Sequence, residues 1–173
     1  MTTHYLQSVK KQFRYYKSLG ERSFCQTGDK DLFWQAHPDS NSIAIIVHHL
    51  SGNMLSRWTN FLTEDGEKEW RQRDLEFEDV IHSRAELLKK WKEGWDCLFQ
   101  ALETINEDNF NQEILIRNQP HSVVEAINRQ LAHYAYHIGE IVFISKMRKG
   151  KDWVSLTIPK GQSAAFNADK FST

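Results

Sequence analysis

Apolar residues at spacings of three and four recur in four long stretches of this chain, and this spacing is the period of an amphipathic α-helix. The stretches run from Tyr5 to Leu19, from Ile43 to Leu62, from Ser83 to Thr104 and from Ser122 to about Gly150. No internal repeat and little alternating strand pattern accompany them. We therefore expect an all-α fold, a four-helix bundle.

The ends of two of these helices are marked in the sequence. Ser83 with Glu86, and Ser122 with Glu125, have the spacing of a capping box, in which a serine precedes a glutamate by three residues. Gly150 suits the end of the last helix, because glycine adopts the backbone conformations found there without strain. The third and fourth helices are therefore predicted to begin at these serines.

Two segments carry no helical stripe: a charged loop at residues 63–80, between the second and third helices, and an extended C-terminal tail at residues 152–173. Residues 112–119 alternate enough to allow a short extended segment. Arg71 and Arg73 in the loop could receive an anionic substrate, although a solvated run of charge is the more ordinary interpretation. We expect specificity to reside in the loop or the tail.

Composition narrows the class of protein. A chain of 173 residues with 40% hydrophobic content can bury one core, so residues 1–173 are expected to form a single domain. The net charge of −1 offers no basic face for nucleic acid. No apolar run approaches the ~20 residues that span a bilayer, and MTTHYLQSVKKQFRYYKSLG lacks the core of a secretion signal, so we expect a cytoplasmic protein without a membrane partner. Cys25 and Cys97 are expected to be buried thiols rather than a disulfide.

A histidine pair in the last helix, His133 and His137, has the spacing that places both imidazoles within reach of one metal ion. Eight histidines placed at random would give about a third of one such pair, so the spacing alone is weak evidence. Helical phase adds to it, because the two residues lie roughly 100° and 60° from Tyr134 on the flank of the apolar stripe. The pair is therefore predicted to face a partly buried place.

The third ligand must come from another helix. His49 lies roughly 100° from Leu50 on the second helix, whereas His48 lies roughly 160° away, near the solvent side. Phase thus favours His49 over His48. Three histidines leave open positions on a metal, which is the arrangement of catalytic rather than purely structural sites.

Two further residues could orient a ligand imidazole or a metal-bound water. Asn53 follows His49 by one turn, and Glu140 follows His137 by three residues. The ordinary alternatives are a packed histidine for each ligand, a helix-to-helix hydrogen bond for Asn53 and a solvated position for Glu140. No catalytic residue is assigned, and a metalloprotease of the HExxH type is excluded because Tyr134 follows His133.

At these positions the chain resembles the DinB-like metal-binding four-helix bundles, which include the bacillithiol and mycothiol S-transferase-like proteins. The resemblance rests on a His-Leu pair in the second helix and an H-x-x-x-H-x-G-E/Q pattern in the last, here His49, Leu50, His133, His137, Gly139 and Glu140. HLSGNMLSRWTNFLTEDGEKEWRQRDLEFE and HYAYHIGEIVFISKMRKGKDWVSLTIPKGQSAAFN are similar to an uncharacterised bacterial branch of that superfamily.

The resemblance implies that His49, His133 and His137 hold nickel or zinc, and that the protein is a homodimer. It also implies transfer or addition of a low-molecular-weight thiol, supplied by a cosubstrate, to a small electrophile. A metal-dependent hydrolase at the same centre is the other enzyme hypothesis. Glu140 stands where glutamine is frequent in the family. The alternative is a non-catalytic, stress-associated binding or structural protein in which the metal joins the second and fourth helices and stabilises the fold.

Overall fold

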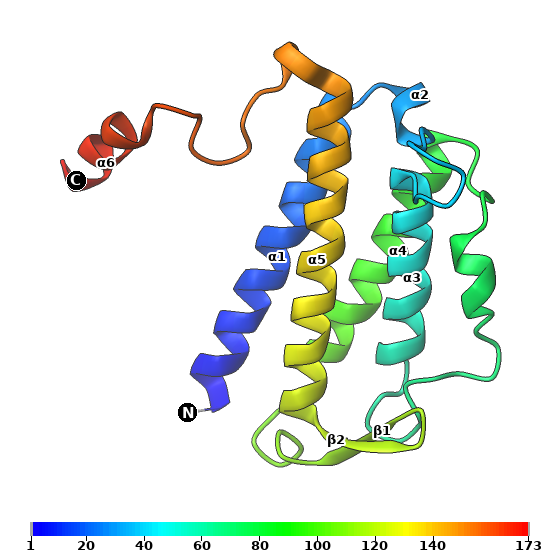
Figure 1. Cartoon of the computed structure of the whole chain (residues 1–173). Coiled ribbons are helices and arrows are strands. Elements are labelled where there is room, and N and C mark those ends of the chain that lie inside the picture. Colours follow the sequence, from blue (N-terminus) through cyan, green and yellow to red (C-terminus); the bar gives the residue numbers. More distant parts are fainter. Residues whose placement is uncertain (1, 173) are drawn as a thin grey trace.

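Four long helices lie side by side in the computed structural model, which describes residues 2–172 (Figure 1). They are α1 (Thr2–Gln26), α3 (Ile43–Trp58), α4 (Arg84–Glu103) and α5 (Val123–Lys149). The chain is mainly helical, as the periodicity predicts, and the described residues also form one small two-stranded sheet.

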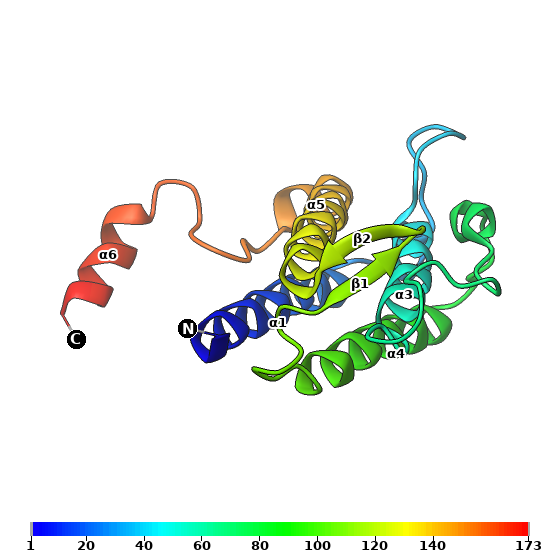
Figure 2. The same ribbon diagram turned by 90° about the horizontal axis from the view of Figure 1, so that it is seen from below.

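The long helices pack most extensively in two pairs, α3 with α4 and α1 with α5 (Figure 2). Gly94 of α4 permits the first pair to approach closely, since a Cβ atom there would lie 2.9 Å from the Cα of Ser51. An aromatic cluster joins the pairs: the rings of Phe13 and Trp95 each lie 5.9 Å from the ring of Tyr134. These three side chains are fully buried at the centre of the core.

The helix ends follow the capping signals. The Ser83 side chain accepts a hydrogen bond from the backbone N–H of Glu86, and Ser122 with Glu125 forms a complete capping box. Gly150, with φ of 61°, ends α5. These three predictions are confirmed.

The small sheet is an antiparallel hairpin of β1 (Glu113–Ile116) and β2 (Gln119–Ser122). Its two-residue turn places Arg117 and Asn118 at φ of 55° and 56°, as a tight hairpin requires. Asp65 accepts hydrogen bonds from both of their backbone N–H groups, at 2.8 and 2.7 Å. The hairpin therefore holds the start of the charged loop. Ser122, the last residue of the hairpin, caps α5.

Some boundaries differ from the sequence-based expectation. The first helix continues past Leu19 to Gln26, and the second ends at Trp58 rather than Leu62, because the chain turns at Asn60 with φ of 47°. A short helix, α2 (Asp29–Leu32), precedes α3. These differences arise from turns and tertiary contacts that leave no periodic pattern.

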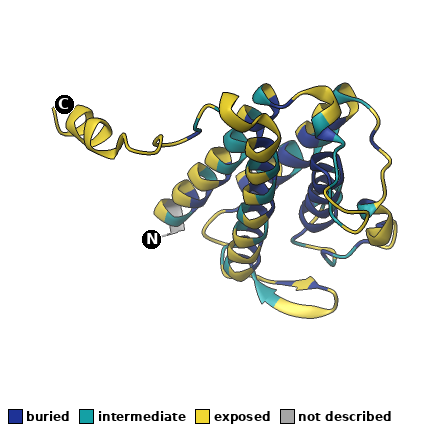
Figure 3. Ribbon diagram, turned by 45° about the horizontal axis from the view of Figure 1, so that its top comes forward, coloured by how far each residue is buried: buried dark blue, intermediate teal, exposed yellow. Residues whose placement is uncertain are grey.

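The loop and the tail both contain helical turns that the sequence pattern did not predict. The loop carries a 3₁₀ helix, η1 (Arg73–Phe77), which packs on α3. The tail carries η2 (Gly150–Asp152) and then α6 (Ser163–Phe171), which lies apart from the long helices (Figure 1). All of α6 is exposed, whereas α3 is buried along most of its length (Figure 3).

Two expectations from composition have different outcomes. Cys25 and Cys97 are both free thiols, but Cys25 is exposed rather than buried, because α1 extends to Gln26 and turns this residue outward. Cys97 is partly buried. Within residues 2–172, none of the helices combines the length and apolar character needed to cross a membrane.

Candidate metal centre

The three predicted histidines converge between α3 and α5. One ligand atom from each of His49, His133 and His137 lies within 4.8 Å of the others. The Nε2 atom of His133 lies 3.2 Å from Nε2 of His49 and 3.1 Å from Nε2 of His137. Two helices distant in sequence thus present three imidazole nitrogens to one point.

The fourth histidine considered, His48, does not join this cluster. It is half-buried rather than near the solvent, and its pKa is lowered by burial and by the nearby Lys90. The expectation that His48 lies near the solvent was wrong, because α4 packs against this side of α3. The preference for His49 over His48 as a member of the cluster is confirmed.

Two carboxylates orient the outer histidines. Glu76 Oε2 lies 2.9 Å from Nδ1 of His49, and Glu140 Oε2 lies 2.6 Å from Nδ1 of His137. A carboxylate only accepts hydrogen bonds, so each Nδ1 donates and each Nε2 keeps its lone pair for the centre of the cluster. Glu140 therefore occupies the orienting position predicted for it.

Glu76 is a functional residue that sequence reasoning missed. It belongs to η1, is buried, and accepts two hydrogen bonds from Arg71, at 2.7 and 2.8 Å. Burial raises the pKa of Glu76, but Arg71 and His49 outweigh this effect and hold the pKa below its ordinary value. Gly52 makes room for it, since a Cβ atom at that position would lie 2.7 Å from Cδ of Glu76.

Burial favours the neutral form of two of the three imidazoles, those of His133 and His137. Burial lowers the pKa of His133 to about 3, with further lowering by His137, His49 and the nearby Arg57. Burial also lowers the pKa of His137, although Glu140 opposes the shift. Neutral imidazole is the form of histidine that binds metals, so the lowered pKa values of His133 and His137 favour binding by these two residues.

The donor set fits a divalent transition metal. An ion about 2.0–2.1 Å from each nitrogen would separate neighbouring nitrogens by roughly 2.9–3.4 Å. The two Nε2 separations that involve His133, 3.1 and 3.2 Å, fall in this range, and the ligand atoms of His49 and His137 lie within 4.8 Å of each other. Imidazole nitrogen suits zinc, nickel, copper and iron, so the chemistry of the residues does not distinguish among these metals.

Of the two roles considered for Asn53, the structure shows the helix-to-helix hydrogen bond, between α3 and α5. Its Oδ1 accepts a hydrogen bond of 3.1 Å from the Tyr134 hydroxyl, which in turn accepts one of 3.1 Å from Nε1 of Trp58. The hydrogen bond of Asn53 thus leads into the core rather than to a histidine. It nevertheless lines the same cavity as the cluster.

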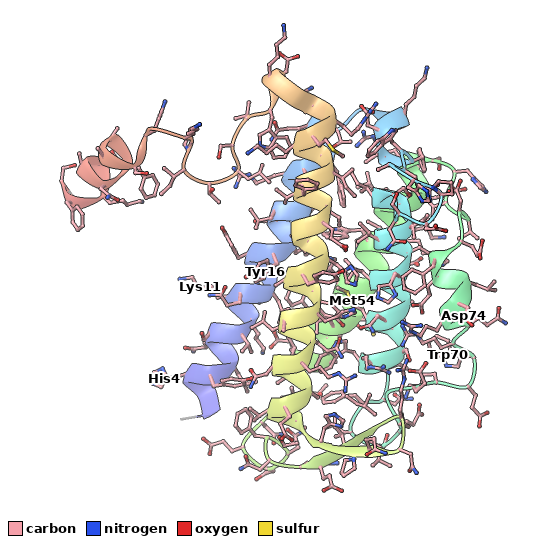
Figure 4. All side chains as sticks on the ribbon, viewed as in Figure 1. His4, Lys11, Tyr16, Met54, Trp70 and Asp74 are labelled. Carbon is pink, nitrogen blue, oxygen red and sulfur yellow. The ribbon has the colours of Figure 1, made fainter. Side chains whose placement is uncertain are left out.

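A cavity of about 410 Å³ opens beside the histidines. All three histidines line it, together with Asn53 and five arginines. The loop around η1 contributes Arg71, Arg73 and Phe77 to the wall. Asp74 of the same loop points away from the helices (Figure 4). The cluster is therefore accessible to a small molecule.

A family model matches residues 1–162 of the chain. The chain belongs to DUF1572. This family carries the description "protein of unknown function". Comparison with curated proteins and with solved structures returned no match. The DUF1572 match includes all three histidines and both orienting carboxylates, and it ends before α6 (Ser163–Phe171).

Proposed function

We propose that this DUF1572 protein binds nickel or zinc through His49, His133 and His137 and catalyses metal-dependent transfer of a thiol to small electrophiles. The observation that carries the proposal is the convergence of three Nε2 atoms beside an open cavity. Carboxylates hold two of the rings, so the cluster is oriented before a metal arrives.

A divalent metal at such a centre lowers the pKa of a bound thiol, so that thiolate is available at neutral pH. The chain's own residues hold and orient the centre and line the space for the reactants. Neither Cys25 nor Cys97 lines the cavity, which supports a thiol supplied by a cosubstrate. A hydrolase reaction at the same centre would use water in place of the thiol.

A second function is a structural one, in which the metal stabilises the fold. It is favoured by the origin of the ligands, since His49 belongs to the α3–α4 pair and the other two belong to the α1–α5 pair. A metal would join the two pairs and stabilise the folded state by binding it selectively. This alternative predicts a large melting shift on chelation and no turnover.

We further propose that the four long helices form a DinB-like bundle, that residues 1–173 are one domain, and that the protein is a cytoplasmic homodimer. Free cysteines support a reducing compartment. Trp70 and Leu75 on the loop, 58% and 51% exposed, would suit an interface. Sedimentation of a single monomeric species at micromolar concentration would exclude the dimer.

Elemental analysis of untagged protein tests the metal site. Wild type, purified without added metal and dialysed against a weak chelator, should contain near-stoichiometric nickel or zinc. His133→Ala should contain little, whereas His48→Ala should match wild type, because His48 lies outside the cluster. Absence of metal in wild type, with no uptake on addition of nickel or zinc, would refute the site.

The same variants distinguish the enzyme from the structural protein. Thiols are screened with electrophiles while the folded fraction is followed by circular dichroism. Activity lost from His133→Ala with the fold retained supports the enzyme. Fold and metal lost together, without turnover in wild type, supports the structural role.

A further inference from the structure

On each of the two helices α3 and α5, a histidine and an arginine line the cavity from the same side of the helix. On α3, His49 and Arg57 are eight residues apart, and on α5, Arg129 and His137 are eight residues apart. Each interval is a little over two helical turns, so the residues of each pair face the same side of their helix. All four line the cavity.

Three of the five arginines lie at the hairpin end of the cavity: Arg57, Arg117 and Arg129. Arg71 reaches toward the histidines through Glu76, and Arg73 lies over Phe77, whose ring stacks on His49. The two helices run in opposite directions, and the end of α3 and the start of α5 meet the hairpin (Figure 1). A guanidinium N–H of Arg57 donates to the carbonyl of Gly66, whose own N–H donates to Leu115 of β1. Arg117, in the hairpin turn, adds another arginine at this end.

Carboxylates contact three of the five arginines of the cavity wall. One oxygen of Glu67 accepts hydrogen bonds from Arg57, Arg71 and Arg117, at 3.2, 3.3 and 2.9 Å. Glu76 pairs with Arg71 alone among the arginines. Two carboxylates thus contact three guanidinium groups, and Asp65 at the hairpin turn adds a third negative charge near Arg57. The unbalanced positive charge of the cavity wall therefore belongs to the other two arginines, Arg73 and Arg129.

Two more arginines in the cavity wall have no carboxylate partner among the described residues. Arg73 lies over the ring of Phe77, 5.4 Å from its centroid, and Arg129 has a contact of 3.2 Å with a ring nitrogen of His121. Both side chains are exposed and line the cavity. Their charge is therefore free to meet an anion that enters.

Buried polar atoms in the same wall also lack partners. Nε of Arg57 and Oε1 of Gln130 are buried, and neither makes a hydrogen bond within the described chain. Both residues are more than nine-tenths buried, at 6% and 3% exposed, and both line the cavity. Buried polar groups are normally hydrogen-bonded, so two residues of this wall carry polar atoms whose hydrogen-bonding capacity the described chain leaves unused.

We propose that the arginines that line the cavity, Arg73 and Arg129 above all, bind a carboxylate or phosphate group of the substrate. This inference rests on the proposed metal function and names the substrate class. The ligand is a small molecule with an anionic group at one end and, at the other, the atom that reaches the histidines. These two parts are about 6–12 Å apart, because four to eight helical residues separate the arginines of α3 and α5 from the histidines along the helix axis. Guanidinium groups suit this task because their paired N–H donors match both anions.

Cobalt-loaded full-length protein gives a direct test, because a thiolate that reaches cobalt produces a charge-transfer absorption. The probes are 6-mercaptohexanoate and its neutral counterpart 6-mercapto-1-hexanol, compared at low ionic strength. The carboxylate should bind about 10-fold more tightly than the alcohol, as expected for a hydrogen bond to a charged group. Equal affinities of the two probes in wild type would overturn the proposal.

Variants locate the anion site. Arg73→Gln and Arg129→Gln should each reduce the preference for the carboxylate, and the double variant should abolish it. Arg14→Gln is the matched control, since Arg14 is exposed on α1 and packs on Phe99 outside the cavity. A preference unchanged in the double variant would also overturn the proposal.

Competition by added anions distinguishes the two sources of the charge. Displacement of 6-mercaptohexanoate by inorganic phosphate at lower concentration than by acetate indicates a phosphate substrate, and the reverse order indicates a carboxylate. If the protein takes up no cobalt, the proposed metal function is refuted, and the anion site is tested separately by calorimetry with inorganic phosphate. Phosphate binding that is lost in Arg129→Gln supports the anion site, and the absence of phosphate binding overturns it.

Discussion

Nδ1 of His49 lies 2.9 Å from Oε2 of Glu76, and this contact links α3 to the charged loop. Both oxygens of Glu76 also accept hydrogen bonds from Arg71. One carboxylate thus holds a proposed metal ligand and an arginine of the cavity wall. The loop is therefore part of the site rather than a connection between helices.

Replacement of this carboxylate tests its role. Glu76→Gln should weaken metal binding by about 10–100-fold, because the neutral amide orients His49 less strongly. Competition with a chromophoric chelator measures the affinity. Glu78→Gln, an exposed change in the same loop, should retain wild-type affinity. Wild-type affinity in both variants would contradict an orienting role for Glu76.

Gly52 allows the same carboxylate to be displaced without changing it. A Cβ atom at Gly52 would lie 2.7 Å from Cδ of Glu76, so Gly52→Ala should push Glu76 away and lower metal affinity. Gly139→Ala is the comparison, since no heavy atom lies within 4 Å of a Cβ built there. It should stabilise α5 by about 1 kcal/mol and leave metal binding unchanged. Metal titration and denaturant unfolding measure these effects, and equal metal affinities in the two variants would refute the displacement.

The hydroxyl of Tyr134 connects Trp58 to Asn53 in the core. Tyr134→Phe should lower the free energy of unfolding by about 1–3 kcal/mol, because it leaves two buried polar groups without a partner. Urea denaturation followed by tryptophan fluorescence measures the loss. Tyr15→Phe, at a residue 44% exposed, should change stability little, and a similarly small loss for Tyr134→Phe would argue against the network.

Acid should weaken the arginine cluster through Glu67. Burial raises the pKa of Glu67, but Arg117, Arg71 and Arg57 outweigh it and hold the pKa below its ordinary value of 4.5. The folded chain therefore binds this proton less readily than the unfolded chain. The stabilisation is present above about pH 4.5 and is lost as the pH falls through the depressed pKa.

The free energy of unfolding, measured across this acid range, tests the assignment. Glu67→Gln should lose less stability than wild type as the pH falls from about 4.5 to 3, because it lacks the titrating group. Glu69→Gln, an exposed change two residues away, should follow the wild-type slope. If the free energy of unfolding falls equally with pH in wild type and in Glu67→Gln, the acid sensitivity comes from groups other than Glu67.

Local patterns predicted the helices and the histidine cluster, because both depend on helical periodicity. The phases of His133, His137 and His49 within their own helices were enough to bring them to one point. The predicted orienting role of Glu140 followed from the same geometry. Its Oε2 does lie within hydrogen-bond distance of His137 Nδ1.

The remainder of the site could not be predicted because tertiary contacts place it. Glu76 lies in a loop without periodicity, and its position depends on Arg71 and on the space that Gly52 leaves. The cluster at the hairpin needs Asp65 to hold the turn at Arg117. Neither contact has a signature in spacing or composition.

The pairing of the helices has a consequence for the order of folding. The helices α3 and α4 are neighbours in the chain and can associate early, whereas α1 and α5 must close a loop that contains everything between them. A chain that has formed only the first pair holds His49 without His133 or His137. The complete ligand set arises only when α5 packs on α3, a contact between segments distant in the chain, so the rate of metal capture during refolding reports that long-range step.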